Sequence, residues 1–113
     1  MLVADSDLTA LSRIYLCFLH QDFKVEACND ALEIGQRVKR FKPGVVVVRS
    51  AMDGLEEGLF SQLAAIPLPV VVLHDGDPFD YCYSNITIVP SGIELQALVK
   101  RVRELTKVSR KGK

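Results

Sequence analysis

The fold is decided by residues 41–50, Phe41-Lys42-Pro43-Gly44-Val45-Val46-Val47-Val48-Arg49-Ser50. Four consecutive valines between a Pro-Gly turn and polar residues predict a strand that is buried on both faces. Such strands lie in the middle of parallel sheets, and ligands bind these sheets at the carboxyl ends of the strands. Arg49 therefore stands at the end of the strand where this fold class carries its reactive groups.

The composition fits one globular domain, with 113 residues of which 49% are hydrophobic and 25% are charged. Fourteen basic and fourteen acidic residues cancel, so duplex DNA or an anionic membrane is not expected to bind the chain through net charge. No apolar run approaches the length of a membrane span, and the N-terminus lacks the basic region and apolar core of a signal peptide. The three cysteines show no C-x-x-C spacing, which favours reduced structural thiols in a cytoplasmic protein.

Predicted strands and helices alternate along the rest of the chain. Strands are predicted at 1–4, 23–28, 45–48, 70–73 and 86–89, and helices at 8–19, 30–41, 55–66 and 92–107. Ser6 or Asp7 is expected to cap the first helix, and Asn29 or Asp30 the second. This alternation predicts right-handed crossovers and a parallel sheet covered on both faces. The connection from 74 to 85 is near the lower limit for a parallel crossover.

The chain resembles the receiver domain of bacterial two-component response regulators over residues 1–106. The resemblance rests on the order and spacing of several segments: Leu2-Val3-Ala4-Asp5-Ser6-Asp7, Phe23-x-Val25 with Asn29-Asp30, Lys42-Pro43-Gly44 and the valines, Met52-Asp53-Gly54, Ile66-Pro67 with Pro69-Val70-Val71-Val72-Leu73, and Val89-Pro90 with Glu94-Leu95. It implies a flavodoxin-like α/β fold, a doubly wound parallel five-stranded sheet in strand order 2-1-3-4-5. The helix between the fourth and fifth strands is expected to be truncated or missing. Residues 107–113 are expected to form a basic tail or linker.

Receivers accept a phosphoryl group on an aspartate with the help of Mg²⁺, and most of the residues for this reaction are replaced here. The resemblance places the acceptor at Arg49, the second acid of the first strand at Ser6, the switch hydroxyl at His74 and the lysine at Val89; Asp5 is retained. A guanidinium can neither attack a phosphoryl group nor bind Mg²⁺. We therefore expect a pseudo-receiver with no enzymatic activity, no cofactor, no metal and no Mg²⁺-dependent phosphoryl donor. Its degenerate phosphorylation pocket consists of Asp5, Ser6, Asp7, Arg49, His74 and Val89.

Two details of this pocket are predicted. Arg49 is expected to pair with Asp5, and also with Asp7, because an unpaired carboxylate at a buried strand end is costly. The alternative is that Arg49 extends into water and covers apolar surface with its methylenes. The resemblance also implies a cis peptide bond between Val89 and Pro90, which would turn the chain sharply from the fifth strand into the last helix.

Three functions remain open at this point. The first is phosphorylation-independent signalling through a protein partner or a homodimer. The resemblance also implies a linked DNA-binding effector domain, because response regulators commonly carry one. The candidate surface for this signalling consists of Phe79, Tyr81, Tyr83 and Ile86, because exposed aromatic side chains suit interfaces. The second is a small-molecule sensor with a pocket at the short connection, lined by the same aromatic side chains. The third is a receiver that is phosphorylated at a surrogate acceptor, Asp53 or Asp5.

Overall fold

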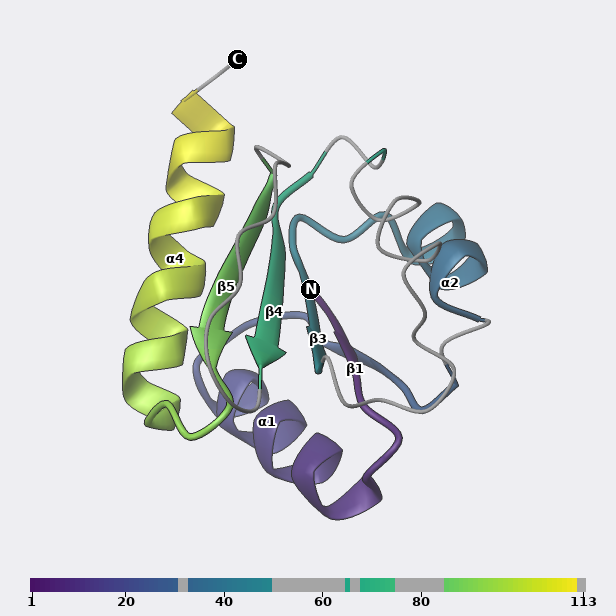
Figure 1. Cartoon of the computed structure of the whole chain (residues 1–113). Helices are drawn as coiled ribbons and strands as arrows, with labels where there is room; N and C mark the ends of the chain where they lie inside the picture. The colour runs from purple at the N-terminus through teal and green to yellow at the C-terminus, as the bar shows by residue number, and fades with distance from the viewer. Residues whose placement is uncertain (31–32, 50–64, 66–67, 75–84, 112–113) are drawn as a thin grey trace.

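The computed structural model describes residues 1–30, 33–49, 65, 68–74 and 85–111, with side chains as far as Thr106. Five strands form one parallel sheet in the order β2-β1-β3-β4-β5 (Figure 1). The strands are β1 (Leu2–Ala4), β2 (Glu26–Cys28), β3 (Val46–Arg49), β4 (Val70–His74) and β5 (Ile86–Pro90), and the helices are α1 (Leu8–His20), α2 (Ile34–Phe41) and α4 (Leu95–Lys111). The predicted fold class and strand order are therefore confirmed.

Two predicted elements fall largely in the gaps between these ranges. Of the helix expected at 55–66, only Ala65 is described, and the segment 75–84, where the truncated helix was expected, lies outside the described residues. Among the described residues, no helix lies between β4 and β5. The helices α1 and α4 cover one face of the sheet and α2 covers the other (Figure 1).

The valines of β3 explain why this strand is central, since their alternate side chains enter two separate hydrophobic clusters. Val45 and Val47 lie in the cluster under α1 and α4, which includes Phe18. Val46 and Val48 lie in the cluster under α2. All four are at most 1% exposed, as predicted for a strand covered on both faces.

The start of α1 is confirmed and the start of α2 is not. The Asp7 carboxylate caps α1, because its Oδ1 accepts the backbone N–H groups of Thr9 at 3.0 Å and Ala10 at 3.3 Å. The predicted cap of α2 at Asn29 or Asp30 is wrong. That helix begins at Ile34, after Glu33, whose side chain makes no capping hydrogen bond.

The second strand is shorter than predicted because Phe23 belongs to the turn that closes α1. Its backbone N–H donates to the Phe18 carbonyl at 3.1 Å. Its ring packs edge-to-face on the Phe18 ring, with centroids 5.1 Å apart. β2 therefore begins only at Glu26.

The predicted cis bond before Pro90 is wrong, because the peptide bonds among the described residues are all trans. The β4–β5 ladder continues through Pro90, which pairs with His74, and the Ser91 N–H donates to the His74 carbonyl at 2.9 Å. The chain turns one step later, where the Ile93 N–H donates to the Pro90 carbonyl at 3.1 Å. A sharp turn at Val89-Pro90 is thus not needed, and the match of Val89 to the receiver lysine is weakened.

The last helix begins and ends later than predicted, running from Leu95 to Lys111 instead of from 92 to 107. Its inward side chains Leu98, Val99 and Val102 are at most 5% exposed and pack under α1. Within the described part of the chain, no helix has the length and apolar character needed to cross a membrane.

Candidate functional site

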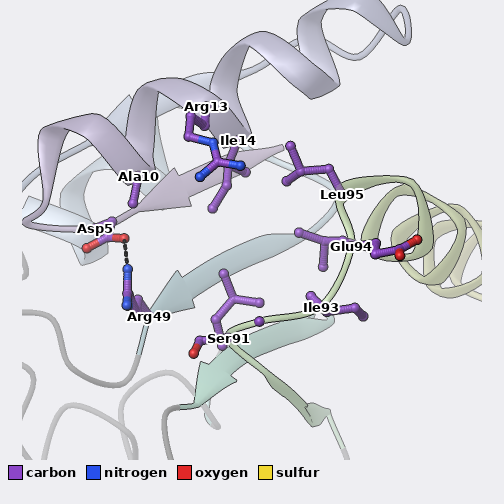
Figure 2. A pocket seen from close by; sticks show the side chains of 12 residues that line it. Asp5, Ala10, Arg13, Ile14, Arg49, Ser91, Ile93, Glu94 and Leu95 are labelled. Atoms are coloured by element: carbon purple, nitrogen blue, oxygen red, sulfur yellow. Dashed lines mark ion pairs between the residues drawn. The ribbon is translucent and has the colours of Figure 1, made fainter.

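The sheet register brings Asp5 and Arg49 together at the carboxyl ends of two neighbouring strands. Ala4 of β1 pairs with Val48 of β3, so the residues that follow them leave the sheet side by side. Nη1 of Arg49 lies 3.6 Å from Oδ2 of Asp5 (Figure 2). The Asp5 side chain is 3% exposed and that of Arg49 is 29% exposed. The predicted ion pair between Arg49 and Asp5 is therefore confirmed.

The second carboxylate oxygen of Asp5 is fixed by the backbone. Its Oδ1 accepts the Asp7 N–H at 3.0 Å, and the Asp5 N–H donates to the Cys28 carbonyl at 3.1 Å. Oδ2 is buried and has no hydrogen-bond partner among the described residues, so Arg49 is the group that offsets its charge. The predicted pairing of Asp7 with Arg49 is wrong, because the Asp7 carboxylate caps α1.

A cavity of about 570 Å³ opens beside this ion pair (Figure 2). It lies between α1, the ends of β1, β3 and β4, and the turn that leads from β5 into α4. Its lining residues are Asp5, Ala10, Arg13, Ile14, Arg49, Leu73, Ser91, Gly92, Ile93, Glu94, Leu95 and Leu98. The lining thus combines two arginines and two carboxylic acids with several aliphatic residues.

The other residues of the predicted pocket do not line this cavity. Ser6 is half-buried after β1, and His74 is half-buried at the end of β4. Val89 is 8% exposed and packs in the core with α1 and α4. Of the six predicted pocket residues, only Asp5 and Arg49 line it, because the others serve the helix cap, the strand ends or the core.

The predicted interaction surface is described at one position only. Ile86 is half-buried and packs against the cluster on the α2 side of the sheet. Phe79, Tyr81 and Tyr83 lie outside the described residues, as does the surrogate acceptor Asp53. The aromatic surface and the pocket at the short connection therefore remain predictions.

Sequence reasoning missed Arg13 as a site residue. Arg13 lies three residues after Ala10 and directly before Ile14, at the flank of the buried face of α1. This position is a weak signal, because a basic residue beside an apolar face is ordinary for an amphipathic helix. The part that residues 91–95 play in the cavity was missed for another reason. These residues lie far from Arg13 in the sequence, and only the folded chain brings them to the same cavity.

Sequence reasoning also missed the outer face of α1. Leu8, Leu16 and Leu19 are 60%, 50% and 45% exposed and are the exposed large hydrophobic side chains of the described residues. Leu8 and Leu19 are eleven residues apart, about three helical turns, so they lie on the same side of the helix. The helical spacing of the sequence predicts that Leu8 and Leu19 belong to the buried apolar side of this helix, and their exposure shows that this prediction is wrong for both.

Two observations bear on metal and redox chemistry. Among the described residues, no group of three or more His, Cys, Asp or Glu side chains could hold a metal ion. Cys28 is 1% exposed and its thiol donates to the Asp30 carbonyl at 3.0 Å. Burial raises the pKa of the Cys28 thiol, which favours the unreactive protonated form.

Comparison with known proteins extends to structure but not to sequence. No protein-family model matches the chain, and no curated protein matches it. A response regulator receiver domain protein (CheY-like) from Methanospirillum hungatei JF-1 matches with a TM-score of 0.84 at 10% identity, over 99% of this chain and 96% of that one. A response regulator from Desulfuromonas acetoxidans matches with a TM-score of 0.74 at 18% identity, over 95% of both chains.

A third solved structure is a two component transcriptional regulator AraC from Clostridium phytofermentans ISDg. It matches with a TM-score of 0.73 at 11% identity, over 98% of this chain and 95% of that one. At these identities the likeness concerns the fold. The chain has the receiver fold that the resemblance implied.

Proposed function

We propose that this chain is a cytoplasmic, non-enzymatic pseudo-receiver that signals without phosphorylation of an aspartate. The observation that carries the proposal is the ion pair between Arg49 and the buried Asp5, with Nη1 and Oδ2 3.6 Å apart. The cation stands at the end of the central strand, in a fold that solved receiver domains share. The fold alone is a weak warrant for function, so the proposal depends on this pair.

The ion pair supports phosphorylation independence for a chemical reason. Mg²⁺ needs carboxylate oxygens as ligands, and the Asp5 carboxylate already faces a guanidinium. Arginine stays protonated at all ordinary pH values, so its positive charge is permanent. The pocket therefore has a fixed charge state that no phosphoryl donor is needed to create.

Signalling of this kind passes through contacts with another protein or a second copy of the chain. The three exposed leucines on α1 support such contacts, because exposed apolar side chains that share one side of a helix favour protein interfaces. The segment that holds Phe79, Tyr81 and Tyr83 remains a second candidate surface. A linked DNA-binding effector domain is supported by the fold similarity to a two component transcriptional regulator.

Incubation with acetyl phosphate and Mg²⁺, followed by intact-mass measurement, tests phosphorylation independence. We expect no phosphoryl adduct, while a receiver that retains its acceptor aspartate gains one under the same conditions. An adduct on the chain, located by peptide mapping at Asp53 or Asp5, would establish the surrogate-acceptor alternative instead.

Light scattering tests self-association through α1. A variant with Leu16→Glu and Leu19→Glu places two charges on the exposed face of that helix, and Gln36→Glu on the exposed side of α2 is the matched control. If a homodimer uses α1, the first variant has monomer mass while wild type and control have dimer mass. Monomer mass in all three removes self-association through this face.

A further inference from the structure

We propose that the cavity beside the ion pair binds a small amphiphilic monocarboxylate, an organic acid with one carboxylate and a short apolar body. This site is not the one expected at the short connection between β4 and β5, and it goes beyond phosphorylation-independent signalling. Its volume of about 570 Å³ falls within the range of about 300–1,000 Å³ that is typical of ligand pockets.

The position of the cavity favours ligand binding. It lies at the carboxyl ends of β1 and β3. In the strand order β2-β1-β3-β4-β5, the direction of winding reverses between β1 and β3. Open α/β sheets bind ligands in the crevice at this switch point.

The charges that line the cavity leave one cation without a described partner. Asp5 and Arg49 offset each other. The carboxylate of Glu94 points away from the cavity, whereas the guanidinium of Arg13 points into it (Figure 2). No hydrogen bond or ion pair joins Arg13 to any other described residue. Arg13 is therefore the lining cation that a carboxylate could approach without displacing Asp5 from Arg49.

The N-terminus of α4 adds to this preference. Residues 91–95 line the cavity where the helix starts at Leu95. The first backbone N–H groups of a helix have no partners within the helix, and they carry a partial positive charge. Arginine binds carboxylates through paired hydrogen bonds. A carboxylate bound to the Arg13 guanidinium would lie near the N-terminus of α4 as well.

The rest of the lining determines the body of the ligand. The aliphatic residues among those that line the cavity are Ala10, Ile14, Leu73, Ile93, Leu95 and Leu98. Inorganic anions have no apolar body to place against these residues. Arg49 already pairs with Asp5, so a phosphate dianion would find only Arg13 as a further cation among the lining residues. A monocarboxylate with a short hydrocarbon or aromatic body could pair with Arg13 and place its body against these aliphatic residues.

Calorimetric titration with hexanoate and phenylacetate tests the proposal, with hexanamide, phenylacetamide and inorganic phosphate as comparison probes. We expect saturable binding of at least one acid to one site, with a Kd of about 1 mM or tighter. The neutral amides and phosphate should bind at least about tenfold more weakly, because each lacks either the charge or the apolar body.

Two variants locate the binding. Arg13→Gln removes the guanidinium that points into the cavity and should weaken acid binding at least tenfold. Arg13 is exposed, so the variant should keep its circular dichroism spectrum and its unfolding midpoint. Lys39→Gln removes one exposed positive charge from α2, on the other face of the sheet, and should bind like wild type. The proposal is overturned if neither acid binds saturably, if Arg13→Gln binds like wild type, or if the amides or phosphate bind as tightly as the acids. These outcomes do not depend on whether acetyl phosphate modifies the chain.

Discussion

Replacing Arg49 by alanine should lower the free energy of unfolding by about 1–3 kcal/mol, because Asp5 then has a buried charge without compensation. The structure sets this range. Asp5 is 3% exposed, and its Oδ2 has no hydrogen bond among the described residues. Breaking a fully buried ion pair costs about 3–5 kcal/mol. The separation of 3.6 Å and the 29% exposure of Arg49 place this pair below that range.

Urea titration followed by circular dichroism measures the effect. With an m-value of about 2 kcal/mol per molar urea, the midpoint should fall by about 0.5–1.5 M. Arg101→Ala is the matched control, since Nη1 of Arg101 lies 4.0 Å from Oε2 of Glu104 and these side chains are 50% and 54% exposed. Surface pairs of this kind are worth about 0–1 kcal/mol, so the control should shift the midpoint much less.

A double-mutant cycle with Asp5→Asn isolates the pair from any other contact of Arg49. Asparagine keeps an acceptor for the Asp7 N–H but carries no charge. Arg49→Ala should therefore cost less than about 1 kcal/mol in the Asp5→Asn background. Equal costs in the two backgrounds, or equal costs of Arg49→Ala and Arg101→Ala, would refute the claim that Arg49 offsets the charge of Asp5.

Three further predictions concern the scaffold. Asp7→Ala should lower stability by about 1 kcal/mol through loss of the α1 cap, and Asp7→Ser should restore most of it; a thermal melt in which the two variants coincide would contradict this role. Phe18→Ala should cost about 3–5 kcal/mol in urea titration, because Phe18 is fully buried; a cost below about 1 kcal/mol would show that the site collapses. Cys28 should react with iodoacetamide more slowly than a free cysteine at pH 8 and faster as pH rises, because burial raises the pKa of its thiol; peptide mapping would reveal equal rates if this is wrong.

Much of the fold could be predicted from the sequence, because its signals are local. The valine run of β3 identifies a strand covered on both faces, and Asp7 precedes an amphipathic run at the position of a helix cap. The pairing of Arg49 with Asp5 followed from strand order, since the resemblance placed both residues at the ends of adjacent parallel strands. Each of these inferences needed only the spacing of apolar residues, a helix-capping residue or the order of adjacent strands.

The rest of the site could not be predicted, because it depends on where distant segments meet. Arg13 and Ser91 come from opposite ends of the chain and line one cavity only after α4 packs beside α1. The expected cis bond failed for a similar reason. Pro90 remains in the ladder opposite His74, and the sequence of β5 does not reveal how far that pairing extends.

The length of α4 has a mechanical consequence. The helix starts at the cavity and continues without interruption to Lys111, past the beginning of β5 (Figure 1). A module fused directly after this helix would be carried on a rigid rod of about 26 Å and would not hang from a flexible tether. Each residue inserted into the rod would rotate the module by about 100° and advance it by about 1.5 Å, whereas an insertion of seven residues would nearly restore the original phase. Output that depends on orientation should therefore vary periodically with insertion length, and output through a loose linker should not.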